Sequence, residues 1–252
     1  MPEWMRFQPG LDTEVIRLTR VDLAPELNKR LASRTQRLVG RSADSASARR
    51  SWKSAAHERK GIKQTLLTIA AGIERCMYCG DSRGTDIDHF QPIKVAPLRA
   101  FEWANHLLAC ASCNSNAKRD AYPCDSTGQC LLVDPMFEEP SDHLKLTLND
   151  GRYGGLTPKG YTTIDVFQLN RVDLRTGREK AFRRCKSMLR DYLHLEGSEQ
   201  FNEATETRDA LECQPFADVL HAMYRIADLP NASIIVGGHE VVMLLRRWRA
   251  GV

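Results

Sequence analysis

The sequence lacks any apolar run that approaches the roughly 20 residues of a membrane-spanning helix. Its first ten residues, MPEWMRFQPG, lack the basic-then-apolar layout of a secretory signal peptide. It also lacks internal repeats and low-complexity tracts. With 252 residues, 42% of them hydrophobic and 27% charged, it has the composition of an ordinary soluble globular protein of one large or two small domains. We therefore expect a cytoplasmic protein with no membrane partner.

Negative charge is scarce in the first third of the chain. Up to Arg75 there are 15 Lys and Arg residues against 8 Asp and Glu residues, whereas the remainder carries 21 against 24. A basic leading segment of this kind is suited to holding a phosphate backbone, but a solvated helical face has the same composition. Charge alone leaves both interpretations open.

Cysteine is plentiful, and half of it falls into two Cys-x-x-Cys pairs. Of eight cysteines, four form the pairs Cys76/Cys79 and Cys110/Cys113, with 30 residues between the pairs. In a reducing compartment such pairs favour zinc over disulfides, and four thiolates suit a closed tetrahedral zinc site. Because a closed site has no open position for water, we expect this zinc to be structural and not the catalyst.

The other four cysteines are scattered along the chain. Cys185 and Cys213 fall in helical patterns, which predicts small buried apolar residues. Cys124 and Cys130 flank the turn-rich stretch CDSTGQC. A second, partial metal site and a disulfide are both open for this pair, and the sequence favours neither.

Hydrophobic spacing predicts helices at both ends of the chain. Leucines at helical intervals indicate a basic helix within residues 23–40, and small polar residues indicate a loop at 42–48. Residues 48–74 carry a helical stripe that Gly61 divides into two shorter helices. Farther on, Asn149-Asp150-Gly151 predicts a hairpin turn. Helices are then predicted at 161–168, 171–194, 198–226 with a break, and 236–249.

The centre of the chain has a different pattern. TDIDHF and PIKV are typical of two short extended pieces, and a helix carrying the second cysteine pair follows from Cys110. The sequence therefore predicts an α+β protein that is mainly helical. It divides into a basic helical N-terminal segment (1–74), a central core (75–125), and a short hairpin plus helical C-terminal region (126–252) without a catalytic motif.

The chemistry-bearing residues lie inside the zinc loop. Asp88-His89 is followed after 15 residues by Asn105 and after 8 more by Asn114, directly behind Cys113. In this order, CMYC…DIDHFQP…NHLLACASCN, the sequence resembles the HNH (ββα-metal) endonucleases in their zinc-supported form. The match covers about 45 residues and fills every motif position. The resemblance implies a zinc-stapled, treble-clef-like ββα-metal core between helical segments.

The same resemblance implies a role for each of four residues. His89 would be the general base that takes a proton from the attacking water. Asp88 and Asn114 would hold one catalytic Mg²⁺ or Mn²⁺, and Asn105 would fix the hairpin loop and help to orient His89. Many members of the family carry His where this chain has Asn114, which leaves the metal preference open.

Elementary chemistry agrees with these roles. Phosphodiester hydrolysis needs a cation at the developing charge, and a hard divalent ion prefers oxygen ligands such as those of Asp and Asn. Histidine titrates near neutrality and is the natural base for water. On a strand, Asp88 and His89 point to opposite faces, so we expect a local twist or a strand end to bring both to one phosphate.

Other polar residues near the motif are assigned less direct roles. Asp86 shares a strand face with Asp88, and we expect it to be structural or surface-exposed. His106 lies in an apolar stretch and is predicted to pack beside the motif. The other histidines have no motif context: His57, His143, His194, His221 and His239. Nucleic-acid contacts are predicted for four cations, although cations near exposed helix ends are also common without DNA: Lys60, Lys63, Lys118 and Arg119.

A second resemblance concerns the frame around the motif. The runs LLVDPMFEEPSDHLKL and TPKG…TIDVFQLNR are similar to those of HNH effectors in bacterial anti-phage defence, such as the HNH partner of Septu-type systems and the related retron-associated effector. This implies DNA as the substrate and an ATPase as a partner protein. Two alternatives stay open: a catalytically silent zinc-binding interaction module, and a restriction enzyme for modified DNA. A silent descendant would be expected to have lost Asp88, His89 or Asn114, and all three are present.

Overall fold

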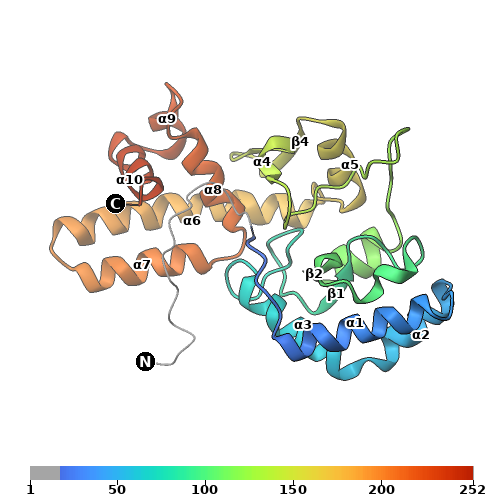
Figure 1. Ribbon diagram of the computed structural model, residues 1–252. Helices are drawn as coiled ribbons and strands as arrows, with labels where there is room; N and C mark the ends of the chain where they lie inside the picture. The colour runs from blue at the N-terminus through green and yellow to red at the C-terminus, as the bar shows by residue number, and fades with distance from the viewer. Residues whose placement is uncertain (1–17, 252) are drawn as a thin grey trace.

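The computed structural model describes residues 18–251 and confirms an α+β fold that is mainly helical (Figure 1). The helices are α1 (Pro25–Val39), α2 (Ser45–Ser54), α3 (Ala56–Ile69), α4 (Pro140–His143), α5 (Pro158–Val166), α6 (Val172–Gly197), α7 (Phe201–Cys213), α8 (Ala217–Ile226), α9 (Ala232–Val236) and α10 (His239–Arg249). The strands are β1 (Asp86–His89), β2 (His106–Ala109), β3 (Leu144–Thr147) and β4 (Arg152–Gly155). Three short helical segments complete the order: η2 (Pro97–Phe101), η3 (Trp103–Asn105) and η4 (Ser112–Lys118).

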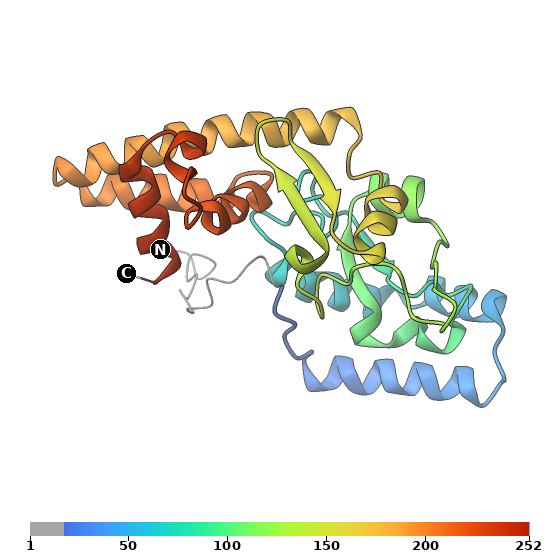
Figure 2. The same cartoon turned by 90° about the horizontal axis from the view of Figure 1, so that it is seen from above.

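The elements are arranged in three parts. The hairpin β1–β2 lies between α1–α3 on one side and the β3–β4 hairpin with α5 on the other, and the view from above shows the same order (Figures 1 and 2). Helices α6–α10 extend away from the hairpin, with α7 running beside α6 (Figures 1 and 2). None of the helices within 18–251 is long and apolar enough to cross a membrane.

The N-terminal helices follow the sequence prediction, except for their boundaries. α1 buries Leu31 and Leu38, as its leucine spacing predicts. The loop predicted at 42–48 is wrong in its second half, because Asp44 accepts a hydrogen bond from Ser47 N and so caps the first turn of α2. The division of residues 48–74 into two helices is confirmed, but the break lies at Ala55.

Gly61 lies within α3 and does not break it. The absence of a side chain at this position allows α1 and α3 to pack closely. A Cβ at this position would lie 2.8 Å from Leu27 Cδ2, so the missing side chain makes room for the leucine. The helical cost of one glycine is about 1 kcal/mol. Close packing of α1 on α3 offsets that cost, which a sequence pattern alone does not reveal.

The first hairpin is confirmed in its first strand and corrected in its second. β1 pairs antiparallel with β2, and its last residue, His89, lies opposite His106. PIKV does not form a strand: Val95 N and Ala96 N donate to Pro92 O at 2.8 and 2.9 Å, which closes a turn. The true partner strand, β2, is buried along its whole length.

The second cysteine pair leads into η4, which is a π-helical segment and not the predicted α-helix. Arg119 N donates to Asn114 O at 2.7 Å, which closes a wider turn than an α-helix would. π-helical turns of this kind are frequent at functional sites. The segment puts Asn114 and Lys118 on a stretch of unusual geometry directly behind the cysteines.

The second hairpin, β3–β4, is confirmed with its turn. Gly151 adopts a φ of +64°, and a Cβ there would lie 2.1 Å from Arg175 O, so glycine is required. Arg178 of α6 also contacts this turn. It is 1% exposed and donates to the carbonyls of Gly151 and Leu169.

The predicted C-terminal helices are confirmed: the break expected within 198–226 lies between α7 and α8, and α9 is an additional short helix before α10. The apolar core of these helices extends to the paired cysteines: Cys76 and Cys113 belong to the same buried cluster as Leu174 and Leu189 of α6. Cys185 is buried as predicted. Cys213 is exposed, which corrects the expectation of burial; it is the last residue of α7, where the helix surface meets solvent.

Candidate active site

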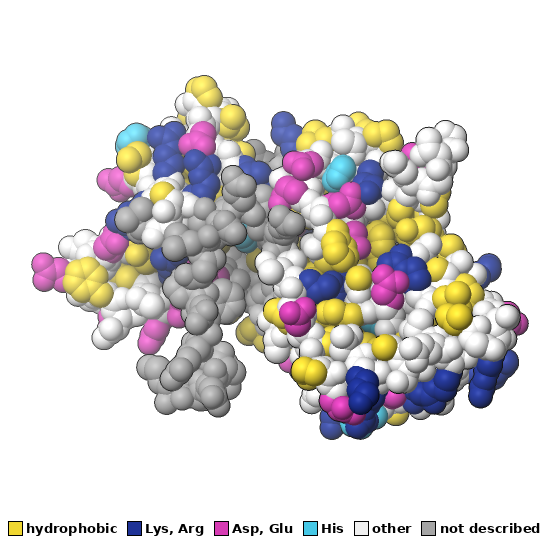
Figure 3. All heavy atoms as spheres, viewed as in Figure 1, with side chains coloured by type: hydrophobic (Ala, Val, Ile, Leu, Met, Phe, Trp, Pro, Cys, Tyr) yellow, Lys and Arg dark blue, Asp and Glu magenta, His cyan; other side chains and the backbone are white. Residues whose placement is uncertain are grey.

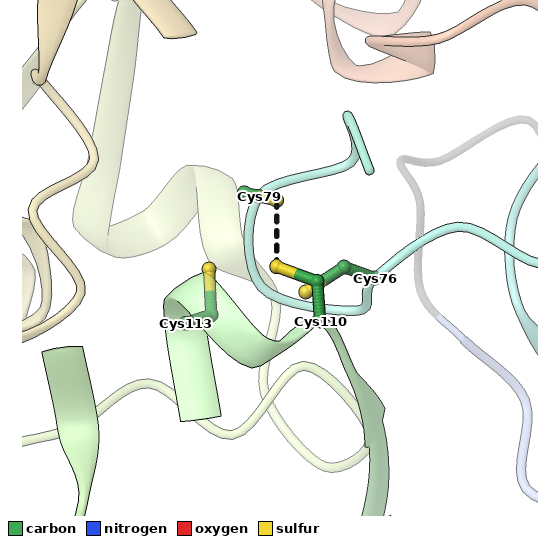
Figure 4. A group of neighbouring side chains, drawn as sticks. All are labelled: Cys76, Cys79, Cys110 and Cys113. Carbon is green, nitrogen blue, oxygen red and sulfur yellow. Dashed lines mark hydrogen bonds between the residues drawn. The ribbon is translucent and has the colours of Figure 1, made fainter. Parts of the chain in front are cut away.

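The four paired cysteines converge on one point. Their Sγ atoms all lie within 4.8 Å of one another, and all four residues are buried. Figure 4 shows Cys76 and Cys79 on one loop, with Cys110 at the end of β2 and Cys113 on η4. Cys79 Sγ and Cys110 Sγ are 3.9 Å apart. The number, type and spacing of these donors fit a closed tetrahedral zinc site. Such a site would join the loop that carries Cys76 and Cys79, here called the knuckle, to the hairpin and η4.

Contacts within the cluster shift the pKa values of individual thiols in opposite directions. Hydrogen bonds with its three neighbours raise the pKa of Cys113, and hydrogen bonds with the same neighbours lower the pKa of Cys110. A bound Zn²⁺ would favour the thiolate form of all four. Among residues 18–251 no second group of three or more Cys, His, Asp or Glu side chains is arranged in this way.

Cys124 and Cys130 do not form a second metal site within that part of the chain. They face each other across an isolated antiparallel bridge as free thiols, and no third metal-binding side chain joins them. Of the two options left open by the sequence, the disulfide is not formed, and a metal site at this pair has no third Cys, His, Asp or Glu ligand among the described residues.

His89 lies at the end of β1 in a form suited to accepting a proton. Its Nε2–H donates to Ala100 O at 3.0 Å, which leaves the lone pair on Nδ1. Burial lowers the pKa of His89 to about 4, because the charged imidazolium is desolvated. The ring is therefore neutral near pH 7, as a general base must be.

Two neighbours hold the His89 ring. Trp52 of α2 meets it edge-on, with ring centroids 4.5 Å apart. His106 is fully buried, meets His89 at 5.0 Å between centroids, and donates from Nε2 to the same Ala100 carbonyl at 3.1 Å. Burial holds the pKa of His106 well below its usual range. The prediction that His106 packs beside the motif is consistent with this position.

Asn105 ties down the loop between the two strands. Its Oδ1 accepts from Gln91 N at 2.7 Å, and its Nδ2 donates to Gln91 O at 3.0 Å and to Arg99 O at 3.2 Å. Its own carbonyl accepts from Phe90 N at 2.9 Å. These bonds fix the backbone directly after His89, which is the geometry expected of a loop-fixing residue.

Asp88 is buried and fully engaged by two partners. The Tyr78 hydroxyl donates to Oδ2 at 2.5 Å, and Lys118 Nζ lies 3.0 Å from Oδ2 and 3.1 Å from Oδ1. Burial raises the pKa of Asp88, and Lys118 opposes that rise. Burial likewise raises the pKa of Tyr78, which keeps the phenol protonated as a donor.

Lys118 is not at the surface, contrary to its predicted contact with nucleic acid. The side chain is 0% exposed, and Nζ also donates to His89 O at 2.7 Å. A buried ammonium needs such partners, because desolvation of an unpaired charge is costly. The π-helical geometry of η4 turns this residue toward the hairpin, which a helical wheel of the sequence would not indicate.

One hollow brings the predicted site residues together. Asp88, His89 and Asn114 line it with Arg119, and α2 supplies a wall with Arg49, Trp52 and Lys53. Adjacent residues of β1 thus face one space at the strand end, as expected. Arg49 Nη2 donates to both carboxylate oxygens of Asp120, at 2.7 and 2.9 Å, and so connects α2 to the segment behind η4.

The remaining predicted residues lie outside this hollow. Lys60 is exposed on α3, and Lys63 Nζ donates to Thr85 O at 2.7 Å, just before β1. Asp86 is half-buried and does not line the hollow. In Figure 3, Lys and Arg side chains gather at the lower right of the molecule, over α1 and α2. The basic N-terminal segment therefore borders the site.

Sequence reasoning missed two contacts. Tyr78, between the first two cysteines, bonds to Asp88 and stacks on Phe167 with centroids 4.0 Å apart. Trp52 contacts His89 from 37 positions away in the sequence. No motif marks either residue, because both contacts depend on how distant segments fold together.

Three curated relatives are similar to parts of the chain. The Septu protein PtuB of Bacillus thuringiensis is 31% identical over 117 residues, covering 44% of this chain and 42% of the relative. A Septu protein PtuB of Bacillus mycoides (strain KBAB4) is 24% identical over 157 residues, covering 50% and 52%. A retron Vc95 HNH protein of Vibrio cholerae serotype O1 biovar El Tor is 24% identical over 158 residues, covering 55% and 74%.

These relatives confirm the resemblance to Septu-type and retron-associated HNH proteins. The chain spans about half the length of the Septu relatives it matches. No family model matches the chain. No solved structure matches it either.

Proposed function

We propose that this chain is a metal-dependent HNH endonuclease that hydrolyses DNA phosphodiester bonds. One observation carries the proposal: a neutral histidine, His89, lines the same hollow as two oxygen-bearing side chains, Asp88 and Asn114. The three residues occupy the motif positions of the HNH endonucleases. Similarity to the retron-associated relative supports the same activity.

Each side chain has a task in this proposal. His89 accepts a proton from the attacking water at Nδ1, while the Ala100 carbonyl holds Nε2–H and fixes the ring. Asn105 holds the loop behind His89. Asp88 and Asn114 supply oxygen ligands of the kind that Mg²⁺ or Mn²⁺ prefers. Such an ion, when bound, stabilises charge on the phosphate and the leaving oxygen.

The surroundings of the hollow suit DNA. Arg49, Lys53 and Arg119 line it, and Lys60 is exposed on the neighbouring helix. Cations in such positions attract a phosphate backbone irrespective of sequence. We therefore assign Arg119 and Lys60 as backbone contacts. Lys118 is not among them because it is buried.

The biological setting is proposed from the relatives. We infer that the chain is the nuclease effector of a bacterial anti-phage defence system, and that it works beside an ATPase partner as the Septu-type resemblance implies. Similarity to two Septu proteins supports this setting. Expression with and without the neighbouring gene products, followed by phage challenge, tests it.

One observation favours a second candidate, a catalytically silent zinc module. The Asp88 carboxylate is already paired with Lys118 and Tyr78. Incubation of the zinc-loaded protein with supercoiled plasmid and Mg²⁺ or Mn²⁺ separates the two functions. The nuclease produces nicked or linear DNA that a chelator of the added ion prevents. The silent module leaves the plasmid intact with every divalent ion, with or without the partner.

A further inference from the structure

A buried cation lies where the proposed catalytic ion would need an oxygen ligand. Lys118 Nζ is within 3.1 Å of both oxygens of Asp88, and the two side chains are 0% and 3% exposed. Nζ also donates to His89 O at 2.7 Å. The ammonium thus donates to one carboxylate oxygen and one backbone carbonyl, and the second carboxylate oxygen lies 3.0 Å away.

The carboxylate has little capacity left for another partner. It offers about four lone-pair positions. Lys118 donates to Oδ1 and lies 3.0 Å from Oδ2, and the Tyr78 hydroxyl donates to Oδ2 at 2.5 Å. Any metal ion that binds Asp88 would lie a few Å from the ammonium, and like charges at that distance repel strongly when they are shielded from water.

Lys118 is also linked to the second proposed ligand. Asn114 and Lys118 both belong to η4, and the Arg119 N to Asn114 O bond of 2.7 Å closes this π-helical segment. Arg119 behind it adopts a φ of +51°. Single π-helical turns are rare overall and are frequent at functional sites. Asn114 and Lys118 are four residues apart on one short segment, so a displacement of Lys118 would act next to the second proposed ligand.

The geometry points to Lys118 as a built-in counterion of Asp88 that a divalent cation must displace. In the described state Lys118 neutralises the buried carboxylate and keeps the site closed to metal. When Mg²⁺ or Mn²⁺ takes Asp88, the ammonium leaves for solvent or a DNA phosphate. This inference rests on the proposed function, because it deepens how the same site is regulated.

The first test measures Mn²⁺ binding to the full-length, zinc-loaded chain without DNA, by the electron paramagnetic resonance of free Mn²⁺. Lys118→Met removes the ammonium and keeps the length of the side chain. We expect it to bind Mn²⁺ at least about tenfold more tightly than the wild type, because the competing charge is gone. Adding Asp88→Asn to this variant should abolish the gain, which locates the ion at Asp88.

Lys53→Met is the matched control. Lys53 lines the same hollow but is exposed, so its charge is screened and its removal should change Mn²⁺ affinity by less than about threefold. Equal affinity of Lys118→Met and the wild type, at equal zinc content and helical circular dichroism, would overturn the inference. So would an equal gain in Lys53→Met, because the effect would then be general electrostatics.

The second test needs no variant and so does not depend on Lys118→Met folding. The wild-type chain is treated with an amine-reactive acylating reagent with and without saturating Mn²⁺, and the modified lysines are identified by mass spectrometry. We expect Lys118 to be protected without the ion and modified with it, whereas Lys60 reacts in both. Continued protection of Lys118 while Mn²⁺ is bound would contradict displacement.

Failure of this inference and failure of the proposed function are distinguishable. If the wild type cuts plasmid but Lys118→Met does not change the Mn²⁺ affinity, the nuclease function stands and the counterion role of Lys118 is refuted. If Lys118→Met raises the Mn²⁺ affinity but the wild type cuts no DNA under any condition, the counterion role of Lys118 stands and the nuclease function is refuted.

Discussion

The hairpin region (residues 76–118) and the helical region (residues 172–249) differ in how many polar side chains they bury. The hairpin region has only two four-residue strands, yet it buries five polar side chains: Asp88, His89, Asn105, His106 and Lys118. The helical region buries Arg178 and Gln214 among many apolar side chains. Because burial of polar groups is costly, we expect the hairpin region to need a bound zinc in addition to its own apolar core, whereas apolar burial alone stabilises the helices.

The proposed chemistry and most of the larger apolar cluster therefore lie in different regions. The polar side chains of the hairpin region contact one another, and the same region contains the four converging cysteines. A site of this kind gains chemistry from its buried polar groups at the cost of stability. The helical region supplies a continuous core on which the knuckle rests.

Loss of one zinc thiolate should have the largest effect. We expect Cys76→Ser to lose zinc and to unfold or aggregate, because a structural zinc contributes about 10 kcal/mol or more in small zinc domains. Thermal unfolding and metal analysis by mass spectrometry check this result. Cys213→Ser, at an exposed cysteine, is the matched control and should match the wild type. Soluble, fully active Cys76→Ser protein would refute this need for zinc.

A cavity in the helical region should have a smaller and purely structural effect. Leu189 of α6 is 0% exposed, so Leu189→Ala should lower the free energy of unfolding by about 2–5 kcal/mol. Zinc content and cleavage rate per folded molecule should not change. Urea unfolding and plasmid cleavage at a low temperature check both. Val172→Ala, at a 77% exposed position, is the control. A large loss of cleavage in folded Leu189→Ala would show that the two regions are coupled.

The smallest effect concerns pH and the buried histidine pair. The folded-state pKa of His106 is well below 6.5, so its stability contribution is complete above about pH 6.5 and is lost as the pH falls toward the folded value. The loss is about 1.4 kcal/mol per pH unit for one histidine. Asn at this position keeps a side-chain donor but does not titrate.

Comparison of the wild type with His106→Asn isolates this term from carboxylates that titrate in the same range, such as Asp134, whose pKa burial raises to about 6. Between pH 7.5 and 5.5, urea midpoints should fall more steeply for the wild type than for the variant. Parallel slopes would mean that His106 is not held neutral by burial.

Much of the fold could be predicted from local patterns. The C-terminal helices and the Asn149-Asp150-Gly151 turn follow from apolar spacing and turn chemistry. The position of Gly61 inside a helix could not be predicted, because it depends on the packing of Leu27 of α1. β2 was missed because all four of its residues are buried, which removes the alternation that marks a half-buried strand.

The candidate site shows the same division. The cysteine cluster and the hollow with Asp88, His89 and Asn114 follow from motif spacing. The burial of Lys118 depends on a π-helical turn, and the Tyr78 bond to Asp88 depends on how the knuckle folds over the hairpin. Neither has a residue pattern that a sequence alone would reveal.

The central claim is that His89 is the base of a nuclease whose frame the cysteines hold. The direct test is the plasmid cleavage rate of His89→Ala relative to the wild type, with Mg²⁺ or Mn²⁺, at equal zinc content. We expect a loss of about 10²–10⁴-fold, the contribution of a positioned general base. His57→Ala, at an exposed histidine outside the hollow, should cut normally. Cleavage by His89→Ala at the wild-type rate would contradict the account.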